Sequence, residues 1–238
     1  MAIKAIVFDF GGVLIEWNPR NLYRKIFKNE SDMEFFLKNI CTTEWNLSLD
    51  KGKPFKQAVA ERIALFPEYA DEIRAFDDRW NEMRGGAIAE NVALLRRLAK
   101  HYPVYGLTNW SEEKFAQTKP EFDFFNLFKG IVVSGIEKEV KPEPRIFEIL
   151  LERYGLNPQE CVFIDDSQPN VDTAEAMGFK ALRFTTPDKL AADLKSAGGG
   201  YGLEKPPLRR LVFNRRNRVF SFFFCLCAVF RRVCRASV

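Results

Sequence analysis

The second half of the chain alternates short apolar runs with amphipathic stretches, and this alternation constrains the fold more than any other feature. The apolar runs are rich in β-branched residues, as buried strands are, and cover residues 104–107, 131–133, 161–164 and 181–184. Helical spacing of apolar residues predicts helices over 91–100, 111–118, 144–154, 169–177 and 187–196. Strands and helices that alternate at short spacing indicate right-handed βαβ units. The sequence therefore predicts an α/β fold with a doubly wound parallel sheet.

A further apolar run opens the chain and stops at an acidic residue. Residues 3–8 read Ile-Lys-Ala-Ile-Val-Phe, which predicts one buried strand. Asp9 follows directly, and Gly11 and Gly12 come soon after; glycine lets a backbone turn sharply and approach a ligand closely. Because ligands bind beyond the carboxyl ends of parallel strands, we expect Asp9 on the floor of a site. The alternative is a plain strand-ending turn, in which Asp and Gly are also common.

Residues 17–86 have a helical pattern without a convincing strand. Ser31, with Glu34 three residues later, has the form of a capping box at the start of one helix. Gly85-Gly86 is predicted to end the last helix of this block. The predicted organisation is a Rossmann-like core made of residues 1–16 and 87–198, with an all-helical cap domain inserted at residues 17–86.

Residues 199–238 differ in composition from the rest of the chain. They hold nine Lys and Arg against one acidic residue, so the body carries 27 basic and 31 acidic residues and is mildly acidic, although the whole chain is +4. An acidic body argues against nucleic-acid binding. The apolar run 219–230 is shorter than the ~20 residues of a membrane-spanning helix. We interpret the segment as an accessory or non-native extension in preference to a membrane-surface anchor.

The cysteines and the N-terminus favour a cytoplasmic protein. Three of the five cysteines lie in residues 199–238, and the other two, Cys41 and Cys161, form no disulfide framework. The N-terminus lacks the features of a signal peptide, because its first apolar run is the predicted strand.

Polar residues follow the predicted strands in a regular order. Asp9 comes first, Thr108-Asn109 second, Lys141 third and Asp165-Asp166 last. Each set alone has an ordinary explanation: a helix cap, a solvated cation or loop carboxylates. Because the carboxyl ends of parallel strands meet at one edge of a sheet, their order together predicts one shared site.

These four sets resemble the four motifs of the haloacid dehalogenase superfamily, which are a strand-end Asp, a Ser or Thr, a Lys and an acidic pair. The resemblance extends from residue 3 to about residue 197. Within the superfamily the motifs look most like the branch of sugar-phosphate phosphatases that includes glucose-1-phosphate phosphatases and the N-terminal phosphatase domain of soluble epoxide hydrolases; they lie at residues 8–14, 107–109, 141–147 and 163–170. The resemblance implies Mg²⁺-dependent hydrolysis of a small phosphorylated metabolite, such as a sugar phosphate.

The resemblance also assigns the catalytic and metal-binding roles. Asp9 would be the nucleophile that forms an aspartyl-phosphate, and Lys141 would offset the clustered negative charge. Mg²⁺ prefers oxygen ligands, and it would be held by Asp9, the backbone carbonyl of Gly11 and Asp166. Asp165 would orient the metal site.

Substrate recognition would come from the strand ends and from the cap. Thr108 and Asn109 would hydrogen-bond the phosphoryl oxygens. Trp17 and Arg20 lie near the junction of cap and core, where an aromatic face suits a sugar ring and a guanidinium suits a phosphate.

One position departs from the family pattern. Most phosphatases of the superfamily carry a second Asp two residues after the nucleophile as general acid/base, and this chain has Gly11 there. General acid catalysis typically contributes about 10²–10⁴-fold in rate. Gly11 leaves two alternatives open: a metal-free 2-haloacid dehalogenase, against which the acidic pair argues, and a catalytically silent protein that binds a phosphorylated ligand.

Overall fold

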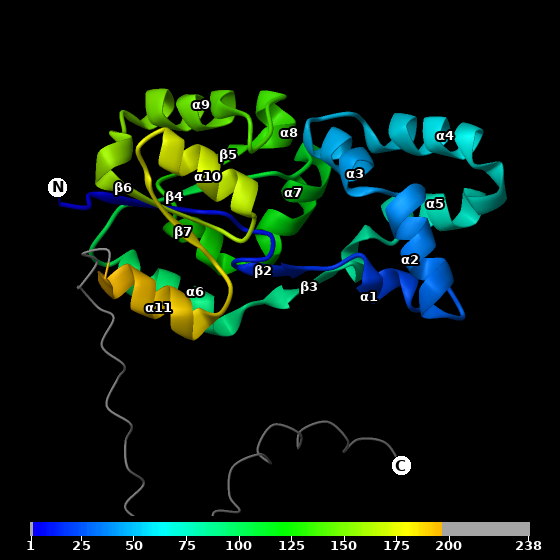
Figure 1. Cartoon of the computed structure of the whole chain (residues 1–238), viewed down its shortest axis with the longest axis horizontal. Coiled ribbons are helices and arrows are strands. Elements are labelled where there is room, and N and C mark those ends of the chain that lie inside the picture. Colours follow the sequence, from blue (N-terminus) through cyan, green and yellow to red (C-terminus); the bar gives the residue numbers. More distant parts are fainter. Residues whose placement is uncertain (1, 197–238) are drawn as a thin grey trace, which may run out of the picture. The chain divides into compact units, whose positions relative to one another are not determined.

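The computed structural model describes residues 2–196, and these form a five-stranded parallel sheet with helices on both faces (Figure 1). The strand order is β5-β4-β1-β6-β7, so the N-terminal strand lies in the middle. The strands are β1 (Ala5–Phe8), β4 (Val104–Thr108), β5 (Gly130–Val133), β6 (Cys161–Asp165) and β7 (Lys180–Arg183). The predicted doubly wound parallel sheet is confirmed.

The side chains of β1 alternate between two apolar layers. Ile6 and Phe8 belong to one buried cluster and Ala5 and Val7 to the other, as the period of two in a strand requires. Figure 1 shows α9 and α10 over one face of the sheet and α6 and α11 over the other. The helices of the core are α6 (Ala89–Leu98), α7 (Glu112–Thr118), α8 (Ser134–Glu137), α9 (Pro144–Tyr154), α10 (Gln168–Ala176) and α11 (Pro187–Ser196).

Five helices follow β2 in the chain and precede β3; we call them the cap helices. They are α1 (Arg20–Tyr23), α2 (Glu30–Asn39), α3 (Thr43–Asp50), α4 (Phe55–Leu65) and α5 (Ala70–Asp78). Single 3₁₀ turns complete the described chain at Pro67–Tyr69, Trp80–Glu82, Lys119–Glu121, Asp123–Leu127 and Pro158–Glu160. The cap helices agree with the predicted helical insertion, and its boundaries at residues 17 and 86 stay a prediction.

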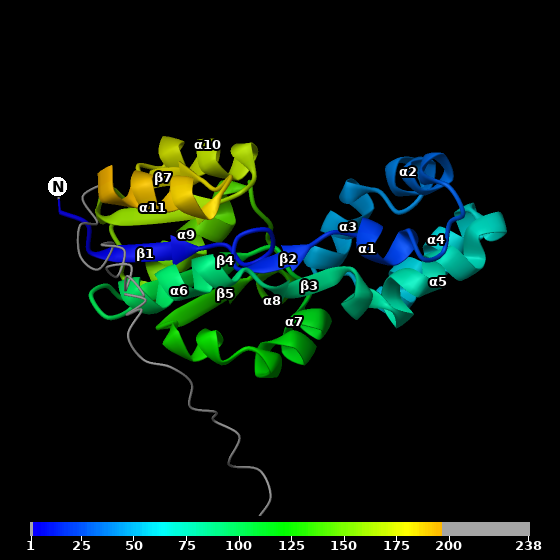
Figure 2. The ribbon, with the colours of Figure 1, turned by 90° about the horizontal axis from the view of Figure 1, so that it is seen from below.

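A short antiparallel strand pair joins the core to the cap helices, where the sequence analysis expected no strand. Strand β2 (Ile15–Trp17) pairs with β3 (Arg84–Ala87), and Figure 2 shows the two lying side by side. β3 contains Gly85 and Gly86 and lacks the apolar alternation that reveals a strand in sequence. A side chain at Gly85 would clash with Glu16, since an added Cβ would lie 2.4 Å from the Glu16 carboxylate. Strand pairing therefore requires glycine there.

Two predicted helix ends also lie elsewhere. Helix α5 ends at Asp78 instead of at Gly85-Gly86. Asn29, and not Ser31, is the N-cap of α2: its side-chain oxygen accepts a hydrogen bond from the Asp32 N–H at 2.9 Å. Asn and Ser are both strong N-cap residues, so two candidates two positions apart are hard to separate by sequence.

Residues 2–196 contain no helix that is both long and apolar enough to cross a membrane. The predicted basic extension, residues 199–238, lies outside the described residues.

The close packing of Gly106 against Phe10 generates a stability prediction. A Cβ at Gly106 would lie 2.3 Å from Phe10 Cζ, and the buried Phe10 ring is held by Phe115, Phe125 and Phe128. We expect Gly106→Ala to lower the free energy of unfolding by about 1–3 kcal/mol, measured by urea denaturation, because overpacking forces the ring to move. Gly86→Ala is the matched control, since its Cβ would meet nothing within 4 Å. Equal losses in both variants would contradict this explanation.

Candidate active site

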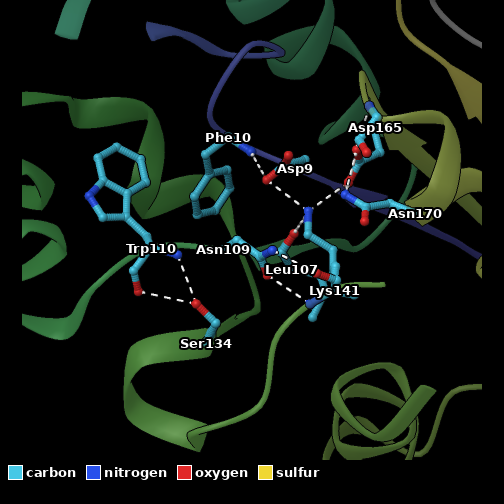
Figure 3. A network of polar contacts seen from close by, with 10 residues as sticks. Asp9, Phe10, Leu107, Asn109, Trp110, Ser134, Lys141, Asp165 and Asn170 are labelled. Carbon is cyan, nitrogen blue, oxygen red and sulfur yellow. Dashed lines mark hydrogen bonds and ion pairs between the residues drawn. The ribbon is translucent and has the colours of Figure 1, made fainter. Parts of the chain in front are cut away.

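Neighbouring parallel strands bring the predicted polar residues to one edge of the sheet. Strand β1 lies between β4 and β6, so Asp9, Thr108 and Asp165 come to the same ends of adjacent strands. Lys141 reaches this edge from the segment between α8 and α9. Figure 3 shows the side chains of Asp9, Lys141 and Asp165 directed toward one another.

Lys141 is the centre of the site, and its side chain is completely buried. Its ammonium lies 2.6 Å from Asp165 Oδ2 and 3.0 Å from Asp9 Oδ1, and it donates a hydrogen bond to the Leu107 carbonyl at 2.9 Å. Burial alone would lower the pKa of Lys141, but the attraction of Asp165 and Asp9 outweighs burial and raises it. Lys141 therefore stays charged within the protein.

Asp9 is held by its backbone and by one carboxylate oxygen. Its N–H donates to the Ile164 carbonyl at 2.9 Å, which ties it to β6. Its Oδ1 accepts from the Phe10 N–H at 2.7 Å and faces Lys141. Burial raises the pKa of Asp9 against the attraction of Lys141, and with the repulsion of the Asp165 and Asp166 carboxylates the pKa reaches about 7. Both contacts described here engage Oδ1 and not Oδ2.

The two acids that follow β6 have different surroundings. Asp165 is completely buried, and its carboxylate accepts from the Ser167 N–H at 2.9 Å and from Asn170 Nδ2 at 2.9 and 3.1 Å, besides binding Lys141. Asp166 is exposed by comparison and sits beside Gly12, where an added Cβ would lie 2.3 Å from Asp166 Oδ2. Gly12 has a φ of +73°, so both its conformation and its surroundings exclude a side chain.

The three carboxylates fit a divalent cation such as Mg²⁺. Asp9, Asp165 and Asp166 each have an oxygen in a group that spans at most 4.8 Å. Three carboxylates face the single ammonium of Lys141, and burial together with the repulsion of Asp165 raises the pKa of Asp166. Hard cations with carboxylate ligands relieve such an excess. Because the oxygens of Asp165 are already bound, Asp9 and Asp166 are the carboxylates that would contact the ion; the contribution of the Gly11 carbonyl stays a prediction.

The side chain of Asn109 supports Lys141. Asn109 Nδ2 donates to the Lys141 carbonyl at 2.9 Å, and the Lys141 N–H donates to Asn109 Oδ1 at 2.8 Å. These two bonds engage Asn109 Oδ1 and one hydrogen of Nδ2, and the binding of phosphoryl oxygens by Asn109 stays a prediction. Thr108 Oγ1 is buried and has no hydrogen-bond partner among the described residues, as expected of a group that binds a ligand.

The two cap residues predicted to bind substrate lie differently. Trp17 packs on Trp80, with ring centroids 4.9 Å apart, and its Cβ is 4.0 Å from where a Cβ of Gly11 would lie. Arg20 instead forms a two-pronged ion pair with Glu34 at 2.5 and 2.7 Å. The ion pair engages Nε and Nη2 of Arg20, and the binding of a substrate phosphate by this guanidinium stays a prediction.

Asn170 and the Leu107 carbonyl hold the charged groups of the site, and neither had a predicted role. Asn170 was visible as a polar residue five positions after Asp165, near the start of a predicted helix. The Leu107 carbonyl carries no signal in sequence, because any residue type would provide it.

Comparisons with known proteins agree with this geometry. The family model described as haloacid dehalogenase-like hydrolase matches residues 3–178, which include all four predicted motifs. The chain is 28% identical over 197 residues to a sesquiterpene phosphatase of Aspergillus oryzae. The match covers 79% of this chain and 92% of that protein. It is 25% identical over 195 residues to a D-ribitol-5-phosphate phosphatase of Bacteroides thetaiotaomicron. This match covers 76% of this chain and 91% of that protein.

A solved structure is also similar. It is a HAD-family enzyme of Bacteroides thetaiotaomicron in complex with magnesium and inorganic phosphate, with a TM-score of 0.59 and 25% identity. The match covers 77% of this chain and 95% of that one.

Because the two acids have different surroundings, we expect Asp165 to affect mainly the stability of the protein and Asp166 mainly its binding of metal. Asp165→Ala leaves the buried Lys141 ammonium with Asp9 as its one carboxylate partner among the contacts described, and we expect a loss of roughly 3 kcal/mol in the free energy of unfolding, measured by urea denaturation. Asp166→Ala removes an acid from an acidic cluster, so stability without metal should hold or rise, while the increase in melting temperature caused by Mg²⁺ should disappear. If Asp166→Ala lowered stability and Asp165→Ala abolished the effect of Mg²⁺, the roles assigned to the two acids would be the wrong way round.

Proposed function

Since the chain belongs to the haloacid dehalogenase-like hydrolases, we propose that it is a phosphatase that removes phosphate from a small phosphorylated metabolite, with Asp9 as the nucleophile. The observation that carries this proposal is the buried Lys141 ammonium between Asp9 and Asp165, with Asp166 beside them. A strand-end carboxylate, a fixed cation and a second, more exposed carboxylate are the groups that phosphoryl transfer to an aspartate needs.

The reaction would proceed in two displacements. In the first, an oxygen of Asp9 forms a bond to phosphorus while the bond from phosphorus to the substrate oxygen breaks, which leaves an aspartyl-phosphate and an alkoxide that takes a proton. In the second, water attacks the same phosphorus, the bond to Asp9 breaks, and inorganic phosphate leaves. Asp9 returns to its carboxylate form at the end.

The described residues supply fixed charge and hydrogen-bond donors for both displacements. Lys141 is held by Asp165 and by the Leu107 carbonyl, so its charge does not need to reorganise when negative charge moves from Asp9 to the phosphoryl group. The Thr108 hydroxyl would donate to a phosphoryl oxygen. Mg²⁺, when bound by Asp9 and Asp166, supplies the positive charge that offsets a phosphoryl dianion.

Gly11 narrows the substrate to one whose leaving oxygen needs little help from an acid. The residue leaves the departing alkoxide without the carboxylic acid that the resembled family places there. Anomeric sugar phosphates release a comparatively stable oxygen, which is why we propose a sugar phosphate. The relative that acts on D-ribitol 5-phosphate supports a polyol or sugar, and the sesquiterpene phosphatase shows that such relatives also include enzymes for apolar substrates.

The dehalogenase alternative explains the missing acid but not the carboxylate cluster. Attack of Asp9 on carbon expels halide, which needs no proton at Gly11. That reaction gives Asp166 no function beside Asp9, and three clustered carboxylates would only repel a haloacid anion.

Replacement of Asp9 tests the proposed function directly. Wild-type protein should release phosphate from a panel of sugar and polyol phosphates with Mg²⁺ and lose this activity in EDTA. Asp9→Asn is nearly isosteric and should lower kcat by at least about 10³-fold, because the amide cannot form the intermediate. Its melting temperature should stay near that of wild type. Halide release from 2-haloacids in EDTA, without phosphate release, would establish the alternative instead.

Gly11→Asp tests the account of the leaving group. A Cβ at this position would make only an ordinary contact with Trp17, so the structure has room for the first atom of the side chain. We expect Gly11→Asp to increase kcat/KM for alkyl phosphates by up to about 10²-fold and to change little for p-nitrophenyl phosphate, whose leaving group needs no acid.

Gly11→Asn is the control, because it has the same size but does not donate a proton as a carboxylic acid does. Equal effects of Asp and Asn on both substrates would contradict this account.

A further inference from the structure

The backbone that follows Thr108 is held in place by the cap as well as by the core. The Trp110 N–H donates to Ser134 Oγ at 2.8 Å, and Ser134 Oγ in turn donates to the backbone carbonyl of Asp50 at 2.6 Å (Figure 3 shows the Ser134–Trp110 contact). Hydrogen bonding by the next amide, that of Ser111, lowers the pKa of the Asp50 carboxyl group against burial, which places this N–H beside the carboxylate. Two successive amides of the segment that bears Thr108 and Asn109 therefore depend on one residue at the end of cap helix α3.

Asp50 is itself fixed within the cap. One turn earlier in α3, Asn46 Nδ2 donates to Asp50 Oδ2 at 3.0 Å. Two residues later the chain turns at Gly52, whose φ is +99°. A Cβ at Gly52 would lie 2.4 Å from Lys138 Nζ and 2.8 Å from the Gly135 carbonyl, so the turn rests directly on the backbone of α8.

The core side of this contact is equally close. A Cβ at Gly135 would lie 2.4 Å from the Glu112 N and 2.8 Å from the Trp110 carbonyl. The turn at residues 50–52, α8 and the segment after β4 thus pack closely, with the Ser134 hydroxyl bridging the first and the last. A shift of this turn must be transmitted to the position of residues 108–111, because close-packed segments leave no slack to absorb it.

We propose that Asp50 is a positioning residue of the phosphoryl site, which places the phosphate-binding segment 108–111 when the cap helix α3 rests on the core. This inference rests on the proposed function and deepens it, since it makes a cap residue part of the apparatus for phosphate binding. Asp50 touches neither the nucleophile nor Lys141 in any contact described here. It acts through the Ser111 amide and through Ser134.

The charge of Asp50 is compatible with this role. Burial raises the pKa of its carboxyl group to about 7, while the Ser111 N–H and the positive charge of Lys141 oppose that rise. The attraction to Lys141 places the carboxyl group within the electrostatic reach of the site. The hydrogen bond itself needs only an acceptor oxygen, which an amide side chain also provides.

Three variants separate positioning from other roles. Asp50→Ala removes the acceptor for Ser111, and Ser134→Ala removes the link between Trp110 and the Asp50 carbonyl. Asp50→Asn keeps an acceptor for the Ser111 N–H, and Asn46 can turn its own amide oxygen toward the new NH₂ group. The matched control is Lys51→Ala, which removes an exposed ion pair to Glu139 and Glu143 at the same turn without touching residues 108–111.

The measurements are kcat and KM for p-nitrophenyl phosphate and the Kd of inorganic phosphate, by calorimetry with Mg²⁺. We expect Asp50→Ala and Ser134→Ala to lower kcat and weaken phosphate binding by roughly 10- to 100-fold, because displacements near 1 Å are that costly. Asp50→Asn should recover most of both, and Lys51→Ala should stay within about twofold of wild type.

Three outcomes would overturn the proposal. A lower melting temperature of Asp50→Ala with an unchanged phosphate Kd would show a purely structural role. An Asp50→Asn variant as impaired as Asp50→Ala, with larger losses for alkyl phosphates than for p-nitrophenyl phosphate, would show proton donation instead. Equal losses in Lys51→Ala would show that any cap contact suffices. If wild type released no phosphate from any substrate, the proposed function would fail, and the phosphate Kd series would still decide this inference.

Discussion

A buried ammonium group has to be paired, and the arrangement of the site follows from how this protein pairs Lys141. Removing a charge from water costs several kcal/mol unless nearby groups of opposite charge compensate. Asp165 supplies most of that compensation, and it is itself held by Ser167 and Asn170. The pair is a rigid support on which Asp9 sits at 3.0 Å from the ammonium. The parallel sheet places Asp9 and Asp165 on adjacent strands, so the same backbone register that builds the core also sets the distances in the site.

Most polar side chains around the site form hydrogen bonds with backbone groups or with other side chains of the protein, and few are available to a ligand. Asn109 is an example, because its amide hydrogen-bonds both the N–H and the carbonyl of Lys141, as a neighbouring strand would. A loop residue is thereby held as firmly as a strand residue. Among the described residues, the groups that remain for a ligand are one oxygen of Asp9, the Asp166 carboxylate and the Thr108 hydroxyl, which has no hydrogen-bond partner there. A small number of free groups on a fully bonded support is what preorganisation requires.

The fold and the four motif positions could be predicted from the sequence because both depend on local patterns. Apolar β-branched runs reveal buried strands, and the geometry of a parallel sheet then brings Asp9, Thr108 and Asp165 together. Other features depend on contacts between distant segments and have no local signal. The β2–β3 pair has no apolar alternation. The side chain of Asn109 hydrogen-bonds backbone 32 positions away, and Arg20 pairs with Glu34, 14 positions away. Asp50 is the same kind of case, since in sequence it is only an acid at the end of a helix.

The narrow β2–β3 junction has a consequence for how such a protein can diversify. The chain leaves the core after β1 and returns before α6 through two strands that pair with each other, with Ile15 opposite Ala87. The segment between β2 and β3, which contains the cap helices, therefore begins and ends at two paired strands. Because neither β2 nor β3 belongs to the five-stranded sheet, we expect insertions, deletions or replacement of that segment to leave the order and register of the sheet unchanged. Exchange of this one segment is a route to a new substrate range, and under the role proposed for Asp50 the replacement would also have to supply an acceptor for the Ser111 amide.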